Sequence, residues 1–285
     1  MKTAILIDTG ANVLENKHEN VYWIPISLLI TKDNKEIDCE DVKDVSQQQL
    51  HDLMINKTPI KTSLPPPGKV ISYIENLFES YDRVIVLTLS SGISSYFKSL
   101  DLIKNEFKDK NLVCIDSRSV SMGILWIVDQ LNELLKTNPM ISDSELESFV
   151  AELTKRIVGG VIVSDLNQLI AGGRIKRFKA AIAKMLKLKL IIRWNGELEF
   201  MDKTSSLNTA IDKLLDIIND ANQYKTKGIE RITILTDFTE ETQINELRST
   251  IEQKTNSKVA ISYLPGCIYA HVGPKNFAIL IEAKA

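Results

Sequence analysis

The segment Leu87–Leu100, LTLSSGISSYFKSL, carries an unusual number of hydroxyl groups in one turn. It begins as a buried strand and ends with the spacing of an amphipathic helix, and its turn includes Ser91 and Ser94. Hydroxyls beside the free backbone amides of a helix start suit an anion, either carboxylate or phosphate. Plain helix capping is the alternative use of the same serines. Asp8 and Asp116 also begin polar clusters after apolar runs, so the sequence predicts a polar pocket at strand ends.

Short β-branched runs alternate with segments of helical spacing in the first half of the chain. The predicted strands are Thr3–Ile7, Val21–Leu29, Arg83–Leu89 and Leu112–Ile115. The predicted helices are Ser46–Asn56, Gly68–Ser80, Ser94–Phe107 and Val120–Leu135. Such alternation predicts an α/β fold with parallel-rich sheets flanked by helices, in which ligands bind at the carboxyl ends of the strands.

The second half repeats this alternation after a break. A helix from Asp143 towards Ile157 ends before Gly159-Gly160, which predicts two α/β domains, residues 1–158 and 159–285. Asn195-Gly196 predicts a hairpin with a two-residue turn. The other predicted strands are Val161–Val163, Ile232–Thr236, Val259–Tyr263, Tyr269–Val272 and Ala278–Glu282, and the helices are Ser206–Ala221 and Thr239–Lys254. Capping boxes are expected at Ser46 with Gln49 and at Ser142 with Glu145.

Composition excludes several classes of function. The chain has 285 residues, 44% of them hydrophobic and 25% charged, and a net charge of -2, which gives no reason to expect a nucleic-acid partner. Its three cysteines have no metal-type spacing, so we expect reduced thiols and no metal. We see no secretion signal and no apolar run of the roughly 20 residues that span a bilayer. We therefore expect a cytoplasmic monomer without a membrane span.

Six motifs, in order from residue 4 to residue 274, resemble those of the DegV family. They are AILIDTGANV, PIKTSLPPPG, LTLSSGISSYFKSL, CIDSRSVSMGI, LNQLIAGGRI and AHVGP. The resemblance implies two α/β domains that bind one long-chain fatty acid non-covalently, in an apolar tunnel of the first domain that ends at the domain interface. It also implies a non-catalytic protein without a cofactor, which presents the acid to a partner kinase.

The resemblance also assigns residues by motif position. It implies that Thr62 and Ser94 donate to the fatty-acid carboxylate, that His271 completes this shell and that Arg174 lies nearby. The neighbouring Ser63 and Ser91 are further ligand-binding candidates. These residue types suit a fatty acid, because each buried methylene contributes about 0.8 kcal/mol to binding and a buried carboxylate needs hydrogen-bond donors. A lone histidine before a turn is more often structural, which is the alternative for His271.

The chain departs from the family pattern at several places, and two of them bear on the ligand and the partner. Ser95-Tyr96 stands where the family usually has Gly-Thr, so Ser95 could either crowd the head group or supply a further donor. In the segment 201–210, MDKTSSLNTA, Asp202, Lys203 and Ser205 stand where the family shows basic residues that resemble a kinase-docking patch. The pocket motifs match better than this segment, so the resemblance favours fatty-acid binding over a kinase partner of the standard kind.

Two further hypotheses concern a basic segment and a hydrolase. Arg174–Arg193 contains eight Lys or Arg and no acid, with apolar residues at helical spacing. It is either a core-packed helix with solvated lysines or a helix that transiently contacts an anionic membrane surface. Ser94, His271 and Asp116 could form the triad of a serine-dependent acyl hydrolase. However, Tyr96 occupies the last glycine position of the nucleophile elbow, which disfavours that activity.

Overall fold

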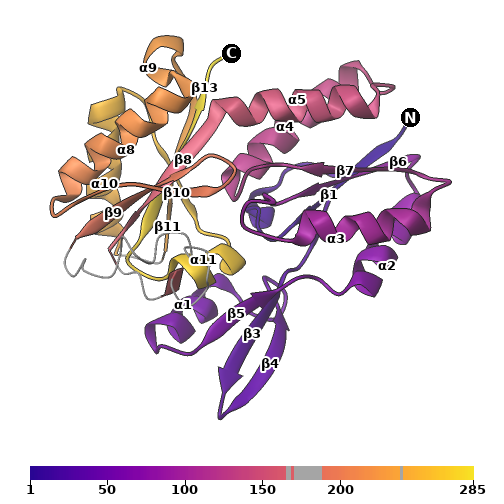
Figure 1. The fold of residues 1–285 in the computed structure, drawn as a ribbon, viewed down its shortest axis with the longest axis horizontal. Helices are drawn as coiled ribbons and strands as arrows, with labels where there is room; N and C mark the ends of the chain where they lie inside the picture. The colour runs from indigo at the N-terminus through magenta and orange to yellow at the C-terminus, as the bar shows by residue number, and fades with distance from the viewer. Residues whose placement is uncertain (165–167, 170–187, 238–239) are drawn as a thin grey trace. The chain divides into compact units, whose positions relative to one another are not determined.

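The computed structural model describes residues 1–164, 168–169, 188–237 and 240–285. The chain forms two compact units, and neither is continuous in sequence (Figure 1). Unit 1 consists of Met1–Ser46, Ile60–Thr154 and Pro265–Cys267, and unit 2 consists of Gln47–Pro59, Lys155–Leu264 and Ile268–Ala285. The expected boundary between residues 158 and 159 falls within a strand of unit 2 and stays a prediction.

Unit 1 is built on a four-stranded parallel sheet in the order β2-β1-β6-β7. The strands are β1 (Thr3–Asp8), β2 (Val21–Ile24), β6 (Arg83–Thr88) and β7 (Asn111–Asp116). All six residues of β6 and five of the six in β1 are buried. Continuous apolar runs of this kind are typical of a parallel strand that is covered on both faces.

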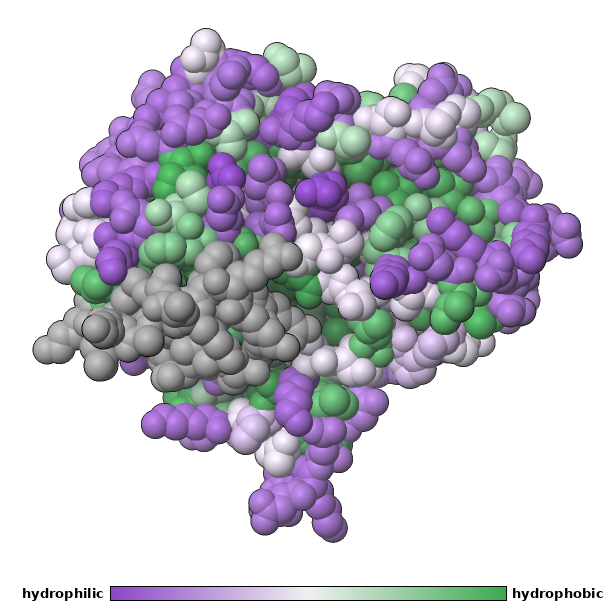
Figure 2. Space-filling view, viewed as in Figure 1, coloured by the Kyte–Doolittle hydropathy of each residue, from purple (hydrophilic) through white to green (hydrophobic). Residues whose placement is uncertain are grey.

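A second sheet of unit 1 is antiparallel and partly exposed. It has the order β4-β3-β5, formed by β3 (Ser27–Lys32), β4 (Lys35–Glu40) and β5 (Ile60–Ser63). The single strand expected over Val21–Leu29 is therefore wrong: Pro25, which has no N–H to donate, separates β2 from β3. The turn between β3 and β4 is exposed and hydrophilic (Figure 2).

The helices of unit 1 all bury apolar residues. They are α2 (Pro67–Phe78), α3 (Tyr96–Ile103), α4 (Met122–Thr137) and α5 (Asp143–Arg156), with 3-10 turns at Val13–Glu15 and Lys104–Phe107. In α2, Val70, Ile74 and Leu77 lie on one face and are buried. The capping box before α5 is confirmed, because Ser142 N donates to Glu145 Oε2 (3.0 Å) and Glu145 N donates to Ser142 Oγ (3.4 Å).

Unit 2 contains a six-stranded mixed sheet in the order β10-β9-β8-β13-β11-β12. The strands are β8 (Ile157–Val163), β9 (Lys189–Trp194), β10 (Leu198–Thr204), β11 (Ile229–Thr236), β12 (Ala260–Tyr263) and β13 (Phe277–Ala283). Among the described strands of this sheet, β11 and β12 run parallel, and the other neighbours run antiparallel. The mixed α/β class is confirmed, with parallel pairing concentrated in unit 1.

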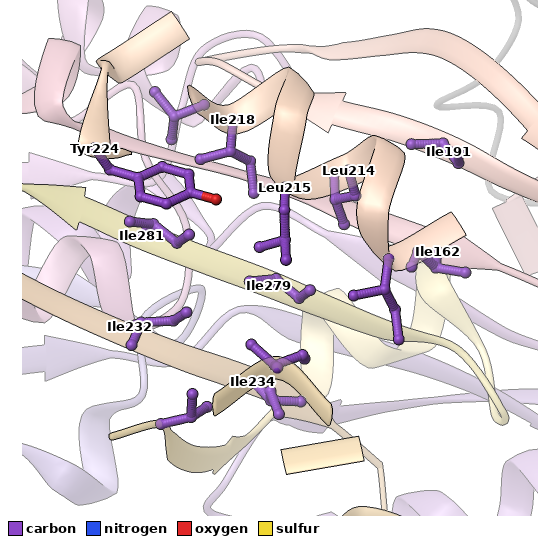
Figure 3. Close-up of a cluster of buried hydrophobic side chains, with 14 of the residues drawn as sticks. Ile162, Ile191, Leu214, Leu215, Ile218, Tyr224, Ile232, Ile234, Ile279 and Ile281 are labelled. Atoms are coloured by element: carbon purple, nitrogen blue, oxygen red, sulfur yellow. The ribbon is translucent and has the colours of Figure 1, made fainter. Parts of the chain in front are cut away.

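Unit 2 contains five described helices, of which those over residues 207–222, 224–227 and 241–255 contribute to its largely aliphatic core. They are α1 (Gln47–Ile55), α8 (Leu207–Asn222), α9 (Tyr224–Lys227), α10 (Glu241–Thr255) and α11 (Gly266–Val272), the last of which starts in unit 1. Leu214, Leu215 and Ile218 of α8 point onto Ile279 and Ile281 of β13 (Figure 3). None of the helices in the described part of the chain is long and apolar enough to cross a membrane.

Three predictions for unit 2 need comment. The hairpin at Asn195-Gly196 is confirmed, but its loop has three residues because Trp194 pairs with Leu198. The strand expected over Tyr269–Val272 is wrong, because these residues form the last turn of α11. Of the basic segment, residues 174–187 lie outside the described residues, and Lys189–Arg193 belongs to β9 rather than to a helix.

Candidate functional site

The polar loops expected after the strands of unit 1 lie together at one edge of the parallel sheet. The loops after β1, β6 and β7 follow adjacent parallel strands, so their starts are neighbours. Ser90 N donates to Ser119 O (3.0 Å), which joins the loop after β6 to the loop after β7. Ser121 N donates to Gly10 O (2.7 Å), which joins the loop after β7 to the loop after β1. This edge therefore gathers most of the buried hydroxyls of unit 1.

Asp8 at the end of β1 is fully buried and holds two of these loops. Its Oδ1 accepts from Gly10 N and its Oδ2 from Leu89 N, both at 2.8 Å. Burial raises the pKa of Asp8 to about 7, because desolvation outweighs the two backbone hydrogen bonds. Gly10 is required here, since a Cβ at this position would lie 2.6 Å from Asp8 Oδ1.

A second buried acid, Asp41, was missed by the sequence analysis. Its Oδ2 accepts from Cys267 N (2.9 Å), and it also accepts from the Thr9 side chain. Cys267 Sγ in turn donates to Thr9 O (3.4 Å). Burial raises the pKa of Asp41 to about 6, and Asp41 contributes to the raised pKa of Asp8. Asp41 lies in the aperiodic stretch CEDVKD, so no sequence signal could have found this contact.

Ser91 and Ser94 differ in how they use their hydroxyls. Ser91 Oγ donates to Asp116 Oδ2 (2.5 Å), while Ser91 N donates to the other carboxylate oxygen (3.1 Å). Ser94 Oγ instead accepts from Tyr96 N (3.2 Å) at the start of α3, and its side chain is half-buried. An accepting hydroxyl keeps its own proton for another acceptor. Of these two candidates, Ser94 is therefore better prepared to donate to a carboxylate.

The remaining candidates lie elsewhere in the chain. Thr62 and Ser63 are the last residues of β5 and pair with Leu28 and Ser27 of β3. Their side chains point to opposite faces, as successive residues of a strand must, and Thr62 is the more buried of the two. His271 is half-buried in the last turn of α11, within unit 2. Arg174 lies outside the described residues.

The loop that leads into α4 is held in a strained conformation. Ser121 has a φ of 59° and a ψ of -133°, which a side-chain-bearing residue rarely adopts. Its hydroxyl donates to Asn12 Oδ1 (2.5 Å), and its amide donates to Gly10. Backbone strain of this kind persists where surrounding contacts impose it, and it concentrates at functional edges. Together, the fold and this edge define a two-unit α/β protein with buried hydroxyls and a buried carboxyl group at the carboxyl end of a parallel sheet.

Comparisons with known proteins agree with that class. The chain matches the family model described as "Uncharacterised protein, DegV family" over residues 2–284. A DegV domain-containing protein of Ureaplasma parvum serovar 3 is 62% identical over 213 residues, which cover 74% of this chain and 98% of that protein. Another, from Mycoplasma genitalium, is 26% identical over 292 residues and is covered in full, as is this chain. The chain belongs to the DegV family.

Solved structures share the fold over the whole chain. DegV of Bacillus subtilis, described as a fatty acid binding protein, superposes with a TM-score of 0.83 at 21% identity and covers 100% of both chains. A fatty acid binding DegV family protein of Streptococcus agalactiae gives 0.82 at 23% identity and the same coverage. A DegV family protein of Eubacterium eligens loaded with heptadecanoic acid gives 0.76 at 18% identity, and covers 99% of this chain and 100% of that one.

Proposed function

We propose that this protein binds one long-chain fatty acid non-covalently, with the acyl chain in unit 1 and the carboxylate held by Thr62, Ser94 and His271. The observation that carries the proposal is the geometry of Ser94, whose half-buried oxygen accepts from Tyr96 N and leaves its proton for a ligand. Membership of the DegV family supports it, as do solved relatives described with fatty acids.

The chemistry of such a ligand matches these residues. An acyl chain gains about 0.8 kcal/mol for each methylene that leaves water, so burial of the tail drives binding. Its carboxylate cannot follow without donors, because an unpaired buried charge is strongly unfavourable. Uncharged hydroxyls and one imidazole supply these donors without the desolvation cost of a second buried ion. Ser63 and Ser91 are secondary candidates, since Ser63 is exposed and Ser91 already donates to Asp116.

The proposal extends to a partner and a location. The bound acid is presented in the cytoplasm, by a monomer, to a kinase that phosphorylates its carboxylate. Asp202 of the segment 201–210 accepts from Lys213 Nζ of α8 (2.7 Å), which lowers the pKa of the Asp202 carboxyl, so Asp202 is already paired within unit 2. A docking surface here would thus differ in charge from a basic patch. Arg174 would lie near the fatty-acid carboxylate, and the basic segment Arg174–Arg193 would transiently contact an anionic membrane surface.

The hydrolase alternative finds less support. In a serine triad the acid orients the histidine, whereas Asp116 accepts from Ser91 Oγ and from the backbone amides of Ser91 and Arg118. Incubation with p-nitrophenyl acyl esters distinguishes the two functions. A hydrolase would cleave these esters, and Ser94→Ala would abolish the cleavage. A carrier would show no cleavage that depends on Ser94.

Ser94→Ala tests the proposal directly. Loss of a hydrogen bond to a charged group costs about 1.5–3 kcal/mol, so we expect stearate affinity to fall by roughly 10- to 100-fold in calorimetry of delipidated protein. Ser91→Ala is the matched control, and it should bind stearate nearly as the parent does. Unchanged affinity in Ser94→Ala, with an unaltered melting temperature, would refute the role of Ser94. Native mass spectrometry that finds no free acid bound to the purified protein would refute the ligand class.

A further inference from the structure

Three hydroxyl groups of unit 1 are buried without a hydrogen-bond partner among the described residues. They belong to Thr88 at the end of β6, Tyr96 at the start of α3 and Ser119 in the loop after β7. The exposed fraction of each residue is at most 1%. A buried hydroxyl without a partner is costly, and native folds seldom keep several in one place. Their grouping therefore points to an atom that they bind.

The strand register brings Thr88 and Tyr96 together. Thr88 pairs with Asp116 of β7 and follows Val86, which pairs with Cys114, so Thr88 and Cys114 share one face of the sheet. Burial and then the charges of Asp8 and Cys114 raise the pKa of Tyr96, so the phenol lies near both. These two residues come from β1 and β7, which flank β6 on either side. The Tyr96 phenol thus covers β6, on the face that carries Thr88.

Ser119 lies at the same end of β6. Its carbonyl accepts from Ser90 N (3.0 Å), and Ser90 follows Thr88 by two residues. Thr88 O in turn accepts from Ser117 N (3.2 Å), so the loop that contains Ser119 folds back over the strand end. Thr88 therefore lies at the end of β6, Tyr96 on the helix that covers it and Ser119 in the loop that folds back over it, and each carries a buried hydroxyl without a partner among the described residues.

In the described part of unit 2, the unpartnered buried polar atoms include Arg193 Nε and two others. Tyr224 Oη and Trp194 Nε1 are also buried without a partner, but they lie on α9 and β9. Tyr224 lies among aliphatic residues, including Ile218 and Ile281, in the core cluster of unit 2 (Figure 3). It offers a control, because it is a buried phenol without a partner that lies outside the proposed subsite.

We infer that the hydroxyls of Thr88, Tyr96 and Ser119 form a second polar subsite, which binds a neutral oxygen atom on the acyl chain of a hydroxylated fatty acid. The inference rests on the proposed function, because the chain that carries this oxygen is the ligand of Ser94. Ser94 Oγ accepts from Tyr96 N (3.2 Å), so the two subsites are joined through one residue. A neutral oxygen fits better than an anion, because Asp8 and Asp116 end the two strands beside β6.

Competition binding on the full, delipidated chain tests the inference. The probes are stearic acid and hydroxystearic acids with the hydroxyl near the carboxyl end, at mid-chain or near the methyl end. We expect at least one hydroxystearic acid to bind about tenfold more tightly than stearic acid. This advantage should be lost in Tyr96→Phe and Thr88→Val, and it should be kept in Tyr224→Phe.

The outcomes separate the inference from the function on which it rests. Stearic acid that binds as tightly as every hydroxystearic acid, as expected if the hydroxyls hold water alone, would overturn the subsite and leave the proposed function standing. An advantage that survives in both Tyr96→Phe and Thr88→Val would also overturn the subsite. If none of the acids binds, the proposed function fails, and the inference fails with it.

Discussion

Unit 2 buries a carboxylate between two cations, whereas unit 1 buries one between backbone amides. In unit 2, Glu282 is fully buried and is met by Arg156 Nη2 at 2.9 Å and Arg231 Nε at 3.3 Å. In unit 1, Asp8 accepts from the amides of Gly10 and Leu89, which compensate its desolvation so weakly that its pKa is raised. Incomplete compensation of buried polar groups lowers stability. The two units therefore differ in how they compensate a buried carboxylate: unit 2 with ion pairs, and unit 1 with backbone amides that leave the pKa of Asp8 raised.

The largest expected effect in this comparison is on the packing of unit 2. A Cβ at Gly160 in β8 would lie 2.6 Å from Ile192 O and would also meet the Leu214 side chain. Gly160→Val should therefore lower the free energy of unfolding by more than about 4 kcal/mol. Hydrogen exchange of peptides from β11 and β13 measures this loss of stability as faster exchange.

Gly68 in α2 of unit 1 gives the matched control. An added Cβ at this position meets nothing within 4 Å, so Gly68→Ala should stabilise the helix by about 0.5–1 kcal/mol. Wild-type protection of β11 in Gly160→Val would contradict the close packing of β8 against its neighbours.

The next largest expected effect is the pH dependence of stability that the buried Asp8 causes. The pKa of Asp8 rises from its ordinary value of 3.8 to about 7 on folding, so the folded state keeps a proton that the unfolded chain has lost. The protonated Asp8 therefore contributes fully to the free energy of unfolding below about pH 4, and this contribution is lost as the pH rises towards about 7. The loss is on the order of 4 kcal/mol. The raised pKa of Asp41 acts in the same direction.

Asp8→Asn tests this dependence, because asparagine does not titrate. Urea unfolding of both proteins, followed by hydrogen exchange of β1 peptides, should show a flatter pH dependence in the variant. The variant should also be less stable at low pH, since its amide group faces one of the backbone amides that Asp8 accepts from. Parallel pH profiles for the two proteins would disprove the raised pKa.

The smallest expected effect concerns a helix cap in unit 2. Ser206 Oγ accepts from Thr209 N (3.3 Å) at the start of α8, which supplies much of the aliphatic core. Ser206→Ala should lower the free energy of unfolding by about 1 kcal/mol, as measured by urea denaturation. Ser206→Asp retains an acceptor and should restore most of the loss. Equal destabilisation by the two changes would show that the cap contributes little.

The sequence predicted the elements whose signals are local. The strands β1, β6, β7 and β11 were recognised as short apolar runs, and the Ser142 capping box as a spacing of three residues. The exposed strand β4 has no apolar run, and only Ile37 and Cys39 alternate with its polar residues, so it was missed. Tyr269–Val272 was assigned to a strand because so short a run, with three apolar residues and one histidine, fits either period. In the structure it belongs to α11, and Cys267 N in the first turn of this helix donates to Asp41. That contact joins residues 226 positions apart.

The order of residues along the chain was enough to indicate an α/β protein with hydroxyl-rich turns after its strands, because periodicity and capping act between near neighbours. Which polar groups are satisfied was decided by folding alone. The Ser91 hydroxyl donates to Asp116, which lies at the end of the next strand. The phenol of Tyr96 is buried because it packs near residues of β1 and β7. Burial and pairing depend on segments far apart in sequence, and these determine pKa values and available donors.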